Sequence, residues 1–104
     1  MRQALVHVKG IPAAILSEIE PFCQYRLEYL PHYQGPAIGF LLPVRKEVYE
    51  WQEFPFWFDN LLQEGARLEM ACRAFHIDAN DKMGLLLKTC VDAIGHVSIT
   101  PYSA

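Results

Sequence analysis

The sequence predicts an α+β domain, built on a small antiparallel β-sheet or partly open barrel with about three helices. Three observations lead to this prediction. The first half is rich in β-forming residues, the second half repeats apolar residues at spacings of three and four, and the chain closes on one more alternating segment. With 104 residues, 52% of them hydrophobic, residues 1–104 fit a single domain with its own core.

A β-hairpin is predicted at the start of the chain. Residues 4–9 and 11–16 are two runs rich in β-forming and apolar residues, and Gly10 between them supplies the turn. Pro12 has no backbone N–H to donate, so its strand should lie at a sheet edge, or Pro12 should stand at a strand start. We therefore expect two antiparallel strands joined near Gly10.

Residues 23–30 form the clearest strand of the sequence, because large apolar residues occupy every second position from Cys23 to Tyr29. A loop over 31–36, with two prolines and a glycine, separates this strand from the next. Residues 37–42 then resume extended structure until Pro43. The first half thus predicts four strands.

Helices are predicted in the second half. Pro55 suits the first position of a helix, where no N–H is needed, and Gly65 marks a break or a tight junction. A second helix is expected from about Ala66. Its apolar face comprises Leu68, Cys72 and Phe75. Asp78 or Asn80 can cap a third helix. The apolar face of that helix comprises Met83, Leu86, Leu87 and Cys90.

The last part of the chain predicts a closing strand. Gly95 marks the end of the helical part, residues 96–100 alternate between polar and apolar, and Pro101 is expected to end the strand. Strands, then helices, then a strand is the order of an α+β domain with antiparallel pairing.

The segment 54–65 holds more aromatic side chains than one helix can bury. At about 100° of rotation per residue, Phe54 and Phe58 share one stripe that is wide enough to face the core. The other members of this core stripe are Leu61, Leu62 and Gly65.

Two large aromatic residues fall outside the core stripe. Phe56 lies on the opposite side of the helical wheel, and Trp57 lies on its flank. Because aromatic residues dominate interface hot spots, both are candidate anchors for a protein partner. Alternatively, both tuck under the preceding loop, since Trp is usually buried. The polar neighbours that complete the candidate partner-binding surface are Asn60, Gln63 and Glu64.

No catalytic, metal or cofactor site is predicted. The six glycines are isolated, so there is no phosphate-binding loop, and no nucleophile motif is present. The histidines are dispersed, and His7 and His96 in predicted strands are expected to be structural. Asp59 and Glu64 lie near a helix start and a junction, where capping is expected rather than acid–base chemistry. We therefore expect a binding module without a cofactor, not an enzyme.

Charge and hydropathy exclude other classes of partner. The net charge of -3, with scattered Lys and Arg, disfavours direct binding of nucleic acid. No apolar run approaches roughly 18 residues, so no membrane span is expected, and the absence of a signal sequence predicts a cytoplasmic protein. The three cysteines are odd in number and widely spaced, so reduced and mostly buried thiols are expected.

Several motifs together resemble the amino-terminal subdomain of HipA-type kinases. The run from Pro55 to Gly65 combines aromatic residues with Asn-Leu-Leu-Gln-Glu-Gly, in which Gln63 stands where that family has Pro. A Leu-Leu pair within 83–87 and then Asp92-Ala-Ile-Gly95 before the last strand continue the pattern. The resemblance covers nearly the whole chain and implies the fold of that subdomain.

The resemblance also implies a function. In HipA-type toxins this subdomain precedes a kinase core with ATP-binding and catalytic motifs, and these 104 residues contain none of them. It therefore points to the stand-alone version of the subdomain in three-component HipBST toxin–antitoxin systems. That version is an antitoxin that binds and inhibits a HipT-like Ser/Thr kinase, within a ternary complex with a HipB-like DNA-binding protein. Trp57, supported by Phe56, would be the principal anchor on the kinase.

Two alternatives remain open from the sequence. The chain could be the non-catalytic amino-terminal subdomain of a full HipA-like kinase, or an unrelated small enzyme whose site is not visible as a motif. A separate downstream reading frame for the kinase would support the antitoxin, whereas one continuous frame would support the subdomain. Turnover by the isolated protein would indicate the enzyme.

Overall fold

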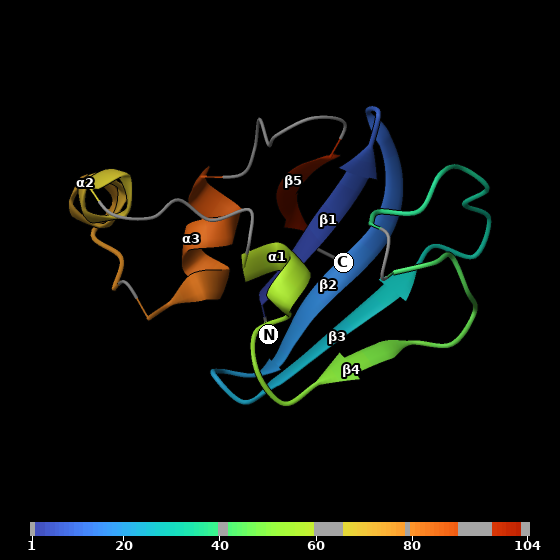
Figure 1. The fold of residues 1–104 in the computed structure, drawn as a ribbon, viewed down its shortest axis with the longest axis horizontal. Coiled ribbons are helices and arrows are strands. Elements are labelled where there is room, and N and C mark those ends of the chain that lie inside the picture. Colours follow the sequence, from blue (N-terminus) through green and yellow to red (C-terminus); the bar gives the residue numbers. More distant parts are fainter. Residues whose placement is uncertain (1, 40–41, 60–65, 79, 90–96, 103–104) are drawn as a thin grey trace.

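The described part of the chain forms five strands and three helices (Figure 1). This computed structural model describes residues 2–39, 42–59, 66–78, 80–89 and 97–102. The elements in order are β1 (Arg2–Val8), β2 (Ile11–Glu20), β3 (Gln24–Tyr29), β4 (Tyr49–Trp51), α1 (Phe56–Asp59), α2 (Ala66–Phe75), α3 (Lys82–Thr89) and β5 (Val97–Tyr102). Strands, helices and a closing strand follow one another as in the predicted α+β class, and α2 begins at Ala66, as predicted.

The strands form one open antiparallel sheet in the order β4-β3-β2-β1-β5. β1 and β2 pair as the predicted hairpin, with an irregularity in register where His7 pairs with Pro12. Pro12 is the second residue of β2, close to the strand start that its missing N–H favours. β4 and β5 are the two edges, so the sheet is open and does not close into a barrel.

The fourth strand lies at Tyr49–Trp51, whereas the sequence predicted it at 37–42. Of the predicted segment the structure describes residues 37–39 and 42, and none of these is in a strand. In the predicted segment, Ile38 N donates instead to the side-chain hydroxyl of Tyr29 at 3.0 Å. The same hydroxyl donates to the carbonyl of Leu42. The side chain of a tyrosine in β3 thus binds the backbone at Ile38 and at Leu42 of this segment.

Two further boundaries differ from the prediction. β5 continues through Pro101 instead of ending there, which an edge strand tolerates because its outer N–H positions have no partner strand. α3 is capped by Asp81, whose Oδ1 accepts the N–H of Gly84 at 3.2 Å, and not by Asp78 or Asn80. The carboxylate of Asp78 instead accepts the N–H of Asn80 at 2.8 Å, within the preceding turn.

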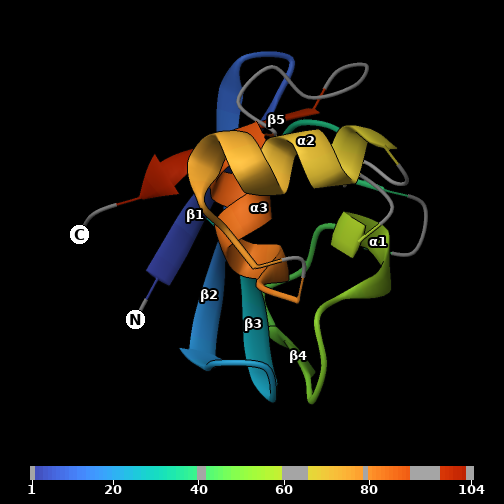
Figure 2. The ribbon, with the colours of Figure 1, turned by 90° about the vertical axis from the view of Figure 1, so that its left-hand side faces the viewer.

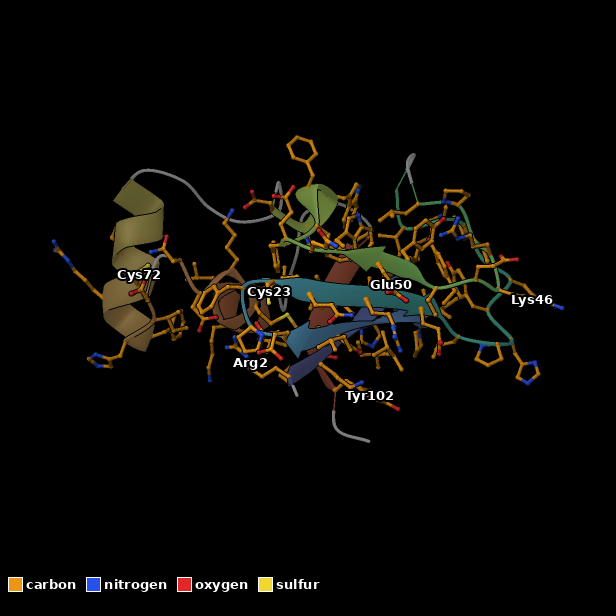
Figure 3. All side chains as sticks on the ribbon, turned by 90° about the horizontal axis from the view of Figure 1, so that it is seen from below. Arg2, Cys23, Lys46, Glu50, Cys72 and Tyr102 are labelled. Carbon is orange, nitrogen blue, oxygen red and sulfur yellow. The ribbon has the colours of Figure 1, made fainter. Side chains whose placement is uncertain are left out.

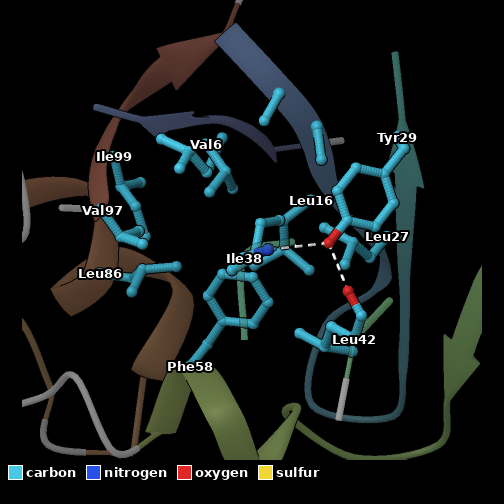
Figure 4. Close-up of a cluster of buried hydrophobic side chains, with 14 of the residues drawn as sticks. Val6, Leu16, Leu27, Tyr29, Ile38, Leu42, Phe58, Leu86, Val97 and Ile99 are labelled. Carbon is cyan, nitrogen blue, oxygen red and sulfur yellow. Dashed lines mark hydrogen bonds between the residues drawn. The ribbon is translucent and has the colours of Figure 1, made fainter. Parts of the chain in front are cut away.

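The helices cover one face of the sheet. Figure 2 shows α3 in front of the strands, α2 on the outer side of α3, and α1 beside them. Strand side chains alternate accordingly, and in β1 the buried residues are Ala4, Val6 and Val8. Figure 4 shows the centre of the core, where Phe58 of α1 and Leu86 of α3 lie over the side chains of the sheet.

The described residues bear on three sequence predictions, which concern membrane spans, metal sites and cysteines. None of the helices there has the length and apolarity that crossing a membrane requires. Across the same part of the chain, no three or more His, Cys, Asp or Glu side chains are grouped to hold a metal ion. Cys23 is exposed in the turn between β2 and β3, and Cys72 is partly buried, so the prediction of mostly buried thiols is wrong for Cys23. Cys90 lies outside the described residues.

Candidate protein-binding surface

Helix α1 is a single turn that its flanking residues fix to the core. Pro55 is buried just before the helix, and its carbonyl accepts the N–H of Asp59 at 3.0 Å, which closes the turn. Proline suits this place because the N–H it lacks has no helical partner there. Phe58 is 0% exposed and belongs to the main core cluster. Pro55 and Phe58 therefore hold α1 against the body of the domain.

Phe56 points away from this attachment. Its side chain is 73% exposed, the highest value among the large apolar residues that the structure describes. The helical wheel had placed Phe56 opposite the core stripe, and Phe54 and Phe58 within it. In the structure, Phe54 packs on the core with its ring edge-on to Tyr25, at 5.3 Å between centroids. The remaining stripe residues, Leu61, Leu62 and Gly65, lie outside the described residues.

Trp57 is half-buried on the flank of α1. Its indole lies directly on the backbone of Gly39, where an added Cβ would stand 2.1 Å from Nε1. Its other neighbour is Phe58, whose ring it meets edge-on at 5.0 Å. Trp57 therefore packs on the loop between β3 and β4, and not under the loop that directly precedes α1, and it keeps part of its surface in contact with solvent. The alternative that both aromatic residues are tucked in is wrong for Phe56.

The loop beneath Trp57 is itself tied to β3. The hydroxyl of Tyr29 accepts the N–H of Ile38 and donates to the carbonyl of Leu42, as Figure 4 shows. Burial raises the pKa of Tyr29, so its hydroxyl stays protonated near neutral pH and continues to donate. Loop, indole and helix are thus connected to the sheet through one buried tyrosine.

An ion pair joins α1 to α3. Lys82 Nζ lies 3.0 Å from Asp59 Oδ2, and both side chains are more than a third exposed. Such exposed pairs contribute only about 0–1 kcal/mol. The pair therefore helps to orient the end of α1 rather than to stabilise the domain.

The structure brings together two of the five predicted partner-binding residues, Phe56 and Trp57. They are adjacent on α1, one exposed and one half-buried. Asn60, Gln63 and Glu64, the polar members of the predicted surface, lie outside the described residues. The candidate surface is therefore defined by an exposed phenyl ring beside a partly exposed indole.

A partly buried ionic cluster lies on the helix-covered face of the sheet, and sequence reasoning missed it. Arg2 donates from Nε and Nη2 to the carboxylate of Glu18 at 2.9 Å each, and from Nη2 and Nη1 to Asp81 at 2.7 and 3.0 Å. Glu18 is 4% exposed. These bonds from Arg2 hold the pKa of Asp81 below its ordinary value.

The Arg2 cluster has a structural role. Its members come from β1, β2 and the start of α3, so it connects the hairpin to the helical layer. Because Arg2 engages both carboxylates, neither is left as a free acid or base. A signal for it exists in the sequence: Arg2 and Glu18 occupy core-facing positions of their strands, in phase with Ala4 and Leu16.

Comparison with known proteins identifies the family. A family model described as the HipA N-terminal domain matches residues 4–100. Among solved structures, one titled "N-terminal domain of HipA toxin" superposes with a TM-score of 0.77 at 23% sequence identity, over 99% of this chain and 94% of that chain. Comparison with curated protein sequences gives no match. The superposition shows a shared fold, and the family match spans nearly the whole sequence: the chain belongs to the HipA N-terminal domain family.

Proposed function

We propose that this protein is a HipS-like antitoxin, which binds a HipT-like Ser/Thr kinase and holds it inactive. Two observations support the proposal. The chain belongs to the HipA N-terminal domain family, whose relative of known structure carries the name of a toxin. In addition, α1 displays Phe56 to solvent from a turn that is otherwise fixed to the core. Contact between proteins, and not catalysis, is the role that these features favour.

The exposure of Phe56 carries the proposal. A phenyl ring in water is unfavourable, and transferring it into a partner's pocket can contribute about 2 kcal/mol or more. That free energy corresponds to roughly a thirtyfold change in affinity. Because Pro55 and Phe58 immobilise the helix, little conformational entropy is lost when the ring is buried. A fixed, protruding aromatic residue is typical of an interface anchor.

Trp57, which the sequence suggested as the principal anchor, becomes the second member of the proposed contact, because it is less exposed than Phe56. Its indole rests on Gly39 and is partly exposed, and it neighbours Phe56 in the sequence of α1. We assign Asn60, Gln63 and Glu64 to the polar rim of the same contact, on the basis of their positions in the sequence. The net charge of -3 disfavours direct contact with DNA, so a HipB-like protein would reach DNA as a third component.

Co-expression with a HipT-like kinase tests the proposal. We expect the two proteins to co-purify, the wild type to restore growth of cells that express the kinase, and Phe56→Ala to do neither. Phe22→Ala is the matched control, because Phe22 is also an exposed phenylalanine, at 62%, in the turn between β2 and β3. Full neutralisation by Phe56→Ala, or equal loss with Phe22→Ala, would refute the assigned surface. A single reading frame that joins this chain to a kinase would refute the antitoxin role itself.

The proposal also includes the absence of catalysis. We expect no ATP binding, because no phosphate-binding or Mg-binding motif occurs in the sequence. Thermal melting with and without Mg-ATP provides the measurement. A nucleotide-dependent rise in melting temperature that persists after repurification would contradict this part of the proposal.

A further inference from the structure

The outer side of β3 is only partly covered by its neighbouring strand. β4 pairs with β3 over three residues, and its first residue, Tyr49, lies opposite Leu27, so Glu28 and Tyr29 have no partner in β4. On the inner side, Leu30 N donates to Ala13 O at 2.8 Å. Because backbone groups alternate between the two sides of an antiparallel strand, the N–H and C=O of Tyr29 point outward, beyond the end of β4.

A groove of about 520 Å³ lies at this place, within the range of roughly 300–1,000 Å³ that is typical of ligand sites. Its lining residues are Glu28, Tyr29, Leu30, Pro31, Tyr33, Val44, Arg45 and Lys46. The rings of Tyr29 and Tyr33 stack at 6.0 Å with an interplanar angle of 16°. The Tyr33 hydroxyl donates to the carbonyl of Pro36, which fixes the ring in place. The floor of the groove is therefore already formed in the unbound protein.

The groove lining carries two cations, Arg45 and Lys46, and one carboxylate, Glu28, so its net charge is positive. Arg45 is engaged within the molecule, since its guanidinium lies 3.7 Å from the ring centroid of Tyr49 and donates to the carbonyls of Glu47 and Val48. Lys46 is exposed and makes no hydrogen bond or ion pair with any other residue that the structure describes. Figure 3 shows Lys46 at the end of the molecule away from Cys72 and α2, with its side chain directed outward.

We propose that this groove is a second protein-binding site, which takes an extended peptide segment with an acidic side chain. The segment pairs with the outward backbone of Tyr29 as a short added strand, which is a known mode of peptide recognition. Its apolar side chain lies on Tyr33 and Val44, and its carboxylate pairs with Lys46. Nucleic acid is disfavoured as the occupant, because one free cation on a chain of net charge -3 cannot neutralise several phosphates. The inference does not depend on the role proposed for α1.

Selection from a phage-displayed library of random heptapeptides against the wild-type protein tests this site. We expect the recovered peptides to combine an acidic residue with β-branched or aromatic residues. Synthetic copies should shift the amide resonances of Tyr29, Leu30 and Val44 in nuclear magnetic resonance titrations. Lys46→Glu should weaken their binding about fivefold or more, the scale of one ion pair together with the repulsion that replaces it. The matched control is Lys9→Glu, an exposed lysine of the β1–β2 turn, which should bind as the wild type does.

Three outcomes would overturn the inference. The recovered peptides could lack acidic residues, they could bind Lys46→Glu as tightly as the wild type, or their resonance shifts could map to α1 instead of the end of β3. Binding of an oligodeoxythymidylate that is lost in Lys46→Glu but retained in Lys9→Glu would reassign the groove to nucleic acid and would equally contradict the proposal.

Discussion

Replacement of Gly39 by Ala tests how α1 is held on the domain. The new methyl group would stand 2.1 Å from Nε1 of Trp57 and 2.8 Å from two further indole atoms, far inside van der Waals contact. The indole cannot simply retreat, because Phe58 meets it edge-on at 5.0 Å and is itself fully buried. Overpacking of this kind costs about 1–3 kcal/mol. We therefore expect a melting temperature at least about 4 °C below the wild type.

The assay for Gly39→Ala is urea and thermal unfolding, followed by Trp fluorescence and circular dichroism. Trp57→Leu in the same background removes the clashing ring, so the double variant should be more stable than the sum of the two single effects predicts. A coupling of about 0.5–3 kcal/mol is expected for side chains in direct contact. A melting temperature of Gly39→Ala within about 1 °C of the wild type, or strictly additive effects, would refute the packing of Trp57 on this loop.

Three further predictions concern the core and the Arg2 cluster. Phe58→Ala should lower the free energy of unfolding by about 3–5 kcal/mol, and Phe56→Ala by only about 0.5 kcal/mol. If urea titrations rank the two variants in reverse, the assignment of the buried and exposed sides of α1 is wrong. Arg2→Ala leaves the buried carboxylate of Glu18 without its cation and should lower the free energy of unfolding by up to about 3 kcal/mol. The loss is smaller than for a fully buried pair because the Arg2 side chain is 39% exposed. An unchanged urea midpoint would show that the ion pair does not stabilise the fold. Arg2 holds the pKa of Asp81 in the folded protein below its ordinary value, so the unfolded state binds the proton more tightly. The stability that this difference provides is present above about pH 4 and should be lost as the pH falls through the pKa of the folded state. Asp81→Asn should lose less stability on acidification than the wild type, and parallel pH profiles would contradict the linkage.

The sequence predicts the elements whose pattern is local. The hairpin around Gly10, the strand that starts near residue 23 and the helix from Ala66 all follow from periodicity and turn residues. The fourth strand could not be placed in this way. Residues 37–42 have the composition of a strand, but the backbone of Ile38 and of Leu42 is bound by the side-chain hydroxyl of Tyr29 from β3. That contact joins residues nine and thirteen positions apart and leaves no periodic signal.

The candidate surface was predictable to a similar extent. The helical wheel separates Phe58 from Phe56, and the structure gives them 0% and 73% exposure. The wheel could not decide how deeply Trp57 is buried, because this depends on Gly39 in a distant loop. The groove near Lys46 was missed for a related reason: it lies where β3 extends two residues beyond its pairing with β4.

The affinity of the purified protein for a HipT-like kinase, the proposed partner, tests the central claim most directly. Titration calorimetry on the wild type, Phe56→Ala and the matched control Phe22→Ala compares two exposed phenylalanines at different places on one fold. With all three proteins shown to melt cooperatively, we predict that Phe56→Ala binds the kinase roughly thirtyfold more weakly and that Phe22→Ala binds it as the wild type does. Equal affinities for all three proteins, or no binding of the wild type at all, would contradict the account.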